Sequence, residues 1–94
     1  MLVGALHRAS IGARCPLKIV TSEWTRWSSA TFNGARHIST WLAAPSAALD
    51  TWLLSLPDVE FALRGNLVAD IALASISRTP HRVEMKIEAL TVEV

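Results

Sequence analysis

The most regular part of the sequence reads NLVADIALASIS (residues 66–77), RTPH (78–81) and RVEMKIEALTVEV (82–94). Two long runs rich in aliphatic residues meet at a short break that contains a proline, and the second run alternates between apolar and charged residues. Alternation with a period of two is typical of a β-strand with one buried face. This stretch therefore predicts a long antiparallel β-hairpin with one side in the core.

The pairing within this hairpin depends on the length of its turn. A connection over residues 78–80 pairs odd-numbered with odd-numbered residues and even-numbered with even-numbered ones. This register places Asp70 opposite Glu88 and within diagonal reach of Lys86. The alternation slips by one residue at Ala89–Leu90, and we expect a β-bulge there that keeps the later apolar residues on the buried face. The reverse face then carries an apolar row of small and aliphatic side chains: Val68, Ala72, Ala74 and Ile76.

A second hairpin is predicted in the first half of the chain. From Leu17 onward β-branched and aromatic residues alternate, and Asn33-Gly34 is the pair preferred in two-residue type I′ turns. A tight turn at this pair places Trp27 opposite Thr40. It assigns one set of residues to a core face: Leu17, Ile19, Trp27, Ile38 and Leu42. It assigns Trp24, Arg26 and Trp41 to the reverse face. Alternatively, residues 28–31 form a loop or a bulge, which would break this register.

One helix is predicted between the two hairpins. Pro45 is tolerated in a first helical turn, and Ser46 is a suitable cap. An apolar stripe with helical spacing follows, formed by Leu49, Trp52, Leu53 and Leu56. Pro57 ends the helix, and so short a helix needs the sheet to pack against. Residues 59–64 alternate again and predict a short strand, followed by a turn at Gly65-Asn66.

These elements predict an α+β fold with an antiparallel sheet of about five strands, in the sequence order β-β-α-β-β-β, and one helix packed on one face. Residues 1–14 are predicted to form a loose N-terminal tail, because His7-Arg8 interrupts their apolar residues. Residues 15–94 are predicted to form a single α+β domain. No run approaches the roughly 20 apolar residues that a membrane helix needs, so no membrane association is expected.

The composition narrows the classes of partner. Hydrophobic residues make up 51% of the chain and charged residues 18%, as in a globular protein. The net charge is +1 and acidic and basic residues are interleaved, so no cluster of basic residues stands out. A nucleic-acid partner is therefore not favoured. Cys15 is the only cysteine, so no disulfide is expected and a reducing, cytoplasmic location is the default. No motif for a metal, a cofactor or a nucleophile is present, and whether the chain is an enzyme stays open.

Five residues stand out as interface or ligand candidates: Trp24, Arg26, His37, Trp41 and Asp70. Trp24, Arg26 and Trp41 form a cluster that would anchor a protein interface or stack on single-stranded nucleic acid. Alternatively, a tryptophan of this cluster belongs to the core and the assignment of the faces is inverted. Arg26, His37 and Asp70 would serve a ligand site or an enzyme only if they open onto one pocket. Asp70 otherwise forms a cross-strand ion pair with Lys86.

One short helix cannot cover a five-stranded sheet. The remaining face would then expose more apolar surface than a monomer normally shows. We therefore expect a small non-catalytic association module that forms a homo-oligomer, a dimer in the first instance, through the sheet face not covered by the helix. Association with another protein fits the same surface.

Overall fold

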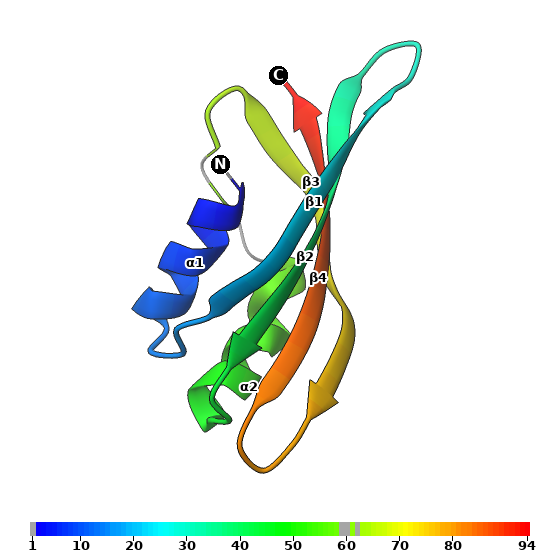
Figure 1. The fold of residues 1–94 in the computed structure, drawn as a ribbon. Helices are drawn as coiled ribbons and strands as arrows, with labels where there is room; N and C mark the ends of the chain where they lie inside the picture. The colour runs from blue at the N-terminus through cyan, green and yellow to red at the C-terminus, as the bar shows by residue number, and fades with distance from the viewer. Residues whose placement is uncertain (1, 59–60, 62) are drawn as a thin grey trace.

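The computed structural model describes residues 2–58, 61 and 63–94. The elements follow the chain as α1 (Leu2–Gly12), β1 (Lys18–Ser28), β2 (Asn33–Ala43), α2 (Ala47–Ser55), the 3₁₀ turn η1 (Leu56–Asp58), β3 (Asn66–Arg78) and β4 (Val83–Glu93). The α+β class is confirmed (Figure 1). The described residues form one four-stranded antiparallel sheet in the order β1-β2-β4-β3, where about five strands were predicted, and two helices, where one was predicted.

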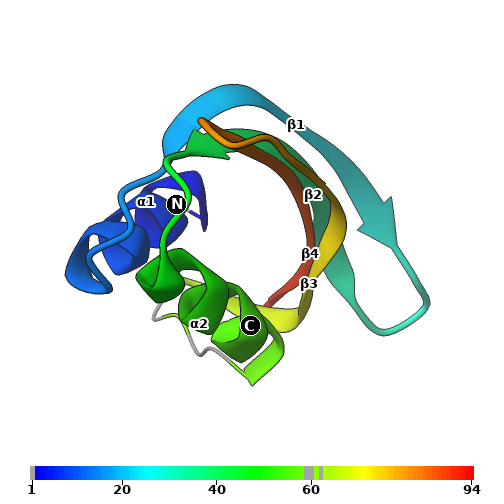
Figure 2. The same ribbon diagram turned by 90° about the horizontal axis from the view of Figure 1, so that it is seen from below.

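Both helices lie on the concave side of a strongly curled sheet (Figure 2). We call this side the helix face and the convex side the open face. The β1–β2 hairpin extends well beyond both helices, which gives the molecule an elongated shape of 47 × 21 × 18 Å (Figures 1 and 2). Neither helix therefore covers the far end of this hairpin.

The core lies between the helix face of the sheet and the two helices. Alternate residues of β4 are buried from Val83 to Ala89, as the alternation in the sequence predicted. The predicted apolar stripe is confirmed, because Leu49, Trp52 and Leu53 of α2 are buried, as is Leu56 at the start of η1. The Ser46 side chain caps α2 by accepting a hydrogen bond of 3.0 Å from the Leu49 N–H. The predicted helix therefore forms for the local reasons that the sequence shows.

The prediction of a loose N-terminal tail is wrong for the residues of α1. Leu2 and Leu6 are buried in the same core as Leu17, while His7 and Arg8 are exposed. The polar pair that interrupts the apolar run thus faces solvent, and the run is one side of an amphipathic helix. Buried Ser10 joins the helix to the sheet, because its hydroxyl accepts from the Leu17 N–H at 3.1 Å.

The predicted tight turn at Asn33-Gly34 is also wrong. Ser28 pairs with Asn33, and the turn spans residues 29–32. Within it Ser29 N–H donates to the Phe32 carbonyl at 2.8 Å, and the Ser29 hydroxyl accepts from Phe32 N–H at 3.2 Å. This is close to the alternative in which residues 28–31 form a loop, but Ser28 stays in β1 and Phe32 belongs to the turn. Gly34 is needed for another reason: a Cβ there would overlap the Thr91 carbonyl oxygen and lie 2.9 Å from the indole ring of Trp27.

The assignment of the two faces in this hairpin is inverted. Trp27 and Ile38 still share a face, because the register moved by an even number of residues. The helices cover the other face, however, so Trp41 is fully buried and Trp27 lies on the open face against Gly34. Of the alternatives for the tryptophans, core packing holds for Trp41.

The register of the second hairpin differs from the predicted one because its turn spans residues 79–82 and not 78–80, so that Arg78 pairs with Val83. Two irregularities in β3, between Val68 and Asp70 and between Leu73 and Ser75, then shift the register further along the strand. β4 keeps its alternation through buried Thr91, so the bulge predicted at Ala89–Leu90 is absent from that strand. Asp70 pairs with Leu90, and Lys86 pairs with Ser75. The predicted opposition of Asp70 and Glu88 is therefore wrong, and Lys86 is four residues along β4 from the partner of Asp70.

Half of the predicted strand over residues 59–64 lies outside the described residues, because Val59, Glu60 and Ala62 are not among them. Leu63 forms an isolated bridge with Asn66. The predicted turn that follows is present, and Gly65 adopts the left-handed conformation at φ 73° that favours glycine.

Candidate functional site

The most exposed part of the sheet is its edge strand β1. All of its residues are exposed except Trp27, which is half-buried. On the helix face Trp24 pairs with His37, yet it lies beyond the helices and keeps 61% of its surface exposed. Because the hairpin projects from the body of the molecule, β1 is open on both faces and along its outer edge (Figure 2).

A shallow hollow of about 370 Å³ lies beside β1 on the open face. Its lining comes from three adjacent strands and consists of Glu23, Trp24, Thr25, Arg26, Trp27, Arg36, Ile38 and Leu90. The register explains this grouping, because Thr25, Arg36 and Leu90 stand side by side across β1, β2 and β4. The hollow is therefore built by the sheet itself.

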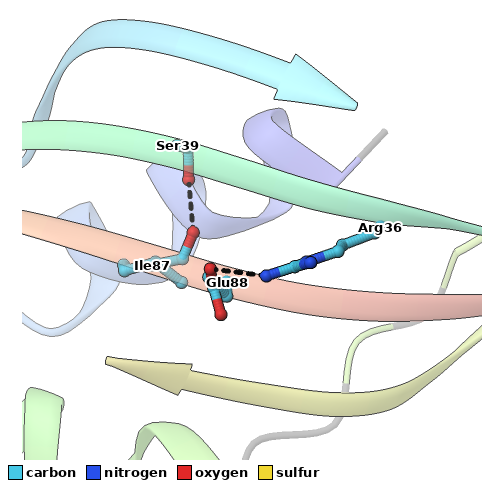
Figure 3. Close-up of polar contacts among 4 residues, drawn as sticks. All are labelled: Arg36, Ser39, Ile87 and Glu88. Atoms are coloured by element: carbon cyan, nitrogen blue, oxygen red, sulfur yellow. Dashed lines mark hydrogen bonds and ion pairs between the residues drawn. The ribbon is translucent and has the colours of Figure 1, made fainter. Parts of the chain in front are cut away.

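The charge at this hollow is largely balanced. The Arg36 guanidinium donates to a Glu88 carboxylate oxygen at 3.0 Å, which joins β2 to β4 across the open face (Figure 3). Both side chains are exposed to solvent, so the pair contributes at most about 1 kcal/mol to stability. Trp27 adds one unusual feature: among the described residues, its buried indole N–H has no hydrogen-bond partner.

His37 lies on the helix face between Trp24 of β1 and Ala89 of β4. Its Nε2 is 3.0 Å from the Thr91 hydroxyl, which in turn donates to the Ala35 carbonyl at 3.4 Å. The tautomer of the ring sets which of the two groups, Nε2 or the Thr91 hydroxyl, donates the hydrogen bond. Burial lowers the pKa of His37 from its ordinary value of 6.5. The contact between His37 and Thr91 thus links β2 to β4.

The structure separates the residues of the predicted tryptophan cluster. Trp41 is in the core, where its indole N–H donates to the Ser39 hydroxyl at 2.7 Å. Trp24 and Arg26 remain together on the helix face of β1, both exposed, as their pairing with His37 and Ala35 shows. Two of the three cluster residues therefore form an accessible surface.

The second predicted group does not converge on one pocket. Arg26 and His37 lie on the helix face, whereas Asp70 pairs with Leu90 on the open face of β3. Asp70 therefore stands at the opposite edge of the sheet and on its other side. An acid–base pair that works at hydrogen-bond distance needs a closer arrangement.

Sequence reasoning missed the residues that build the hollow, above all Trp27, Arg36 and Leu90. Their proximity depends on β2 lying beside β4, which are separated by α2 and β3 in the chain. The opposite charges of Arg36 and Glu88 were a signal, but only once these two strands are known to be neighbours.

The described residues contain no group of three or more histidines, cysteines or acids that could hold a metal ion. Cys15 is a buried free thiol, and burial raises its pKa, which disfavours the reactive thiolate. Within the described part of the chain, neither helix has the length and apolar character needed to cross a membrane.

Comparison with protein-family models, with curated proteins and with solved structures finds no match.

Proposed function

We propose that this protein is a small non-catalytic association module that binds a second copy of itself. The contact surface is β1 together with the hollow beside it, which we call the β1 surface. The observation that carries this proposal is the exposure of an edge strand of 11 residues along nearly its whole length. A long uncovered edge strand is a template for association with another chain.

Apolar side chains support the same surface. Ile19, Val20 and Trp24 are 40%, 49% and 61% exposed, and Phe32 in the adjoining turn is 54% exposed. Soluble monomers rarely concentrate so many large exposed apolar groups along one strand and its turn. The net charge of +1 adds little long-range repulsion between copies.

The proposed surface differs from the one expected from the sequence alone. That expectation placed the contact on the face away from the helix, with both Trp24 and Trp41 on it. In the structure the open face contributes the hollow, while Trp24 extends from the helix face of the same strand. Both parts meet at β1, which makes this strand the centre of the proposed surface.

The proposal includes a homodimer as the first assembly and allows a further protein partner on the same surface. It also places the protein in the cytoplasm. That part rests on the single cysteine, which is a free thiol in the structure.

Sedimentation velocity from low to high micromolar concentration tests self-association directly. We expect the mass-average species to rise toward twice the monomer mass. A protein that stays monomeric over this range contradicts the proposal.

Thr25→Arg tests the location of the surface. Thr25 is exposed, lies near the middle of β1 and lines the hollow, so a bulky cation there should weaken the dimer at least tenfold. The matched control is Thr51→Arg on α2, where the replaced threonine is also exposed. Equal weakening by both variants would show that the dimer does not use the β1 surface.

A further inference from the structure

We infer that two copies pair their β1 strands antiparallel about a two-fold axis at Thr25, which joins two four-stranded sheets into one continuous sheet. This inference rests on the proposed self-association and specifies its geometry. The occupant of the edge is therefore a second copy of this chain, held first by main-chain hydrogen bonds.

The backbone of β1 offers hydrogen-bonding groups to such a partner. In an antiparallel ladder, hydrogen-bonded and non-hydrogen-bonded pairs alternate. Ser29 and Phe32 form a hydrogen-bonded pair, so every second residue of β1 counted back from Ser29 also bonds to β2. Thr25 is one of these residues. The intervening residues, including Trp24 and Arg26, then direct their N–H and C=O groups outward.

The strand is regular where the pairing has to occur. Its register with β2 shifts between Ile19 and Thr21 and then continues without interruption from Thr21 to Ser28. This part of β1 contains no proline, which would remove an outward donor. A second strand can therefore follow it over about seven residues.

Side-chain phase restricts the possible registers. Antiparallel partners must keep both helix faces on the same side, so even-numbered residues pair with even-numbered ones. A two-fold axis at Glu23 would place two carboxylates opposite each other, and an axis at Arg26 would do the same with two guanidinium groups. Both arrangements are destabilised by like charges. An axis at Ser22 or Trp27, or nearer the ends of the uninterrupted stretch Thr21–Ser28, would leave at most about three residues of each copy paired within it. The axis is thereby confined to Trp24 or Thr25.

The axis at Thr25 makes the better set of contacts. It places Trp24 opposite Arg26 of the second copy, and by symmetry the same contact forms twice on the helix face. A guanidinium over an indole ring is a favourable cation–π arrangement. On the open face Thr25 meets its own counterpart, and this pairing of β-branched residues suits a strand. An axis at Trp24 would instead leave Arg26 opposite Ser22.

Cysteine cross-linking tests this register at single-residue resolution. In a Cys15→Ala background, Thr25→Cys would place two thiols on the axis in a non-hydrogen-bonded pair, with Cα atoms about 4.5 Å apart. Disulfides need a Cα separation of roughly 4.4–6.8 Å. We therefore expect mild oxidation to convert most of the protein into a covalent dimer.

Thr21→Cys in the same background is the matched control. Thr21 is also an exposed threonine of β1 and points to the same face as Thr25. In the proposed dimer its counterpart is eight residues away along the strand, or roughly 26 Å. It should remain uncross-linked. Equal cross-linking of both variants, or none at Thr25→Cys in a sample that sediments as a dimer, overturns the proposed register.

A pair of substitutions at Trp24 tests the predicted neighbour without oxidation. Trp24→Arg would face Arg26 of the second copy and repel it, whereas Trp24→Glu would face the same guanidinium and attract it. We expect the dimer Kd of Trp24→Arg to exceed that of Trp24→Glu at least tenfold at low salt, with a smaller ratio at high salt. Equal Kd values overturn the Trp24–Arg26 contact.

The experiments separate the two proposals. A wild-type protein that never dimerises contradicts the proposed function itself. A wild-type dimer that fails the cross-linking and charge tests retains self-association but excludes pairing of β1 about Thr25.

Discussion

The sheet ends in two edge strands that differ in how they are protected. β3 is interrupted by two register shifts, and Asp70 stands at the first of them. η1 packs against β3, and Arg78 at its end forms an ion pair of 2.9 Å with Asp50 of α2. β1 has one shift near its start and no comparable cover along the rest of its length.

A difference of this kind between two edges would restrict the proposed association to one side of the sheet. Bulges, charges and covering segments are the common means by which proteins prevent edge strands from pairing with other chains. β3 combines all three. Over Thr21–Ser28, β1 has charged residues but neither a bulge nor a covering segment. The proposed dimer needs this asymmetry, because two equally open edges would allow the sheet to extend without limit.

The largest expected effect is on stability and comes from blocking the close approach of the Gly34 backbone to Thr91 and Trp27. Gly34→Val would force a side chain against the Thr91 carbonyl and the Trp27 ring. We expect the free energy of unfolding to fall by roughly 2–3 kcal/mol, measured by urea denaturation.

Gly12→Ala is the control for this prediction, because a Cβ at Gly12 meets nothing within 4 Å. Its effect should stay below about 1 kcal/mol. An unchanged urea midpoint for Gly34→Val would show that β1 does not depend on this contact.

The next largest effect is on the dimer Kd and comes from removing an exposed apolar side chain at one edge or the other. Trp24 of β1 and Ile76 of β3 both lie on the helix face, with 61% and 37% of their surfaces exposed. Trp24→Ala should raise the dimer Kd by roughly thirtyfold, corresponding to the approximately 2 kcal/mol of an interface hot spot. Ile76→Ala should leave the Kd within about twofold of wild type. Sedimentation equilibrium measures both, and the reverse order would place the interface at β3.

The smallest effect concerns pH. Burial lowers the pKa of His37 below 6.5, so the unfolded chain takes up a proton before the folded chain does as the pH falls. This contribution to stability is complete above pH 6.5 and is lost as the pH falls from there through the lowered folded pKa. His37→Gln should remove that part of the pH dependence in urea titrations. An NMR titration that gives His37 a pKa at or above 6.5 would contradict this prediction.

The same titration sharpens the comparison between the edges. His37 pairs with Trp24, and a second copy over Trp24 would reduce access of water to the ring. Its pKa should therefore fall further as the protein concentration rises into the dimer range. The ring would show no such change if the second copy bound at β3.

Local signals predicted local structure well. α2 follows from Ser46, Pro57 and a stripe of apolar residues, all within one short segment, and each acts as expected. The sequence does not predict the N-terminal helix, because His7-Arg8 interrupts its apolar residues. The pair is compatible with helix once it is placed on the exposed side.

The register and the site depend on contacts distant in the chain. Asn33-Gly34 has the chemistry of a tight turn, but Ser29 closes a different turn and Gly34 is required by Thr91 of β4. Which face the helices cover depends on the whole core, and this is why Trp24 was placed on the correct strand but on the wrong side. The hollow beside β1 needs the adjacency of β2 and β4 and was therefore not predicted.

Cys15 has a practical consequence for measurements on every variant that retains it. It is the single thiol of the chain and is buried where α1 leads into β1, next to Leu17 in the core. A thiol reagent reaches it only when this junction opens, so the rate of modification reports the free energy of local opening. Every variant that retains Cys15 thus carries its own probe of whether the N-terminal helix stays docked, with no added label.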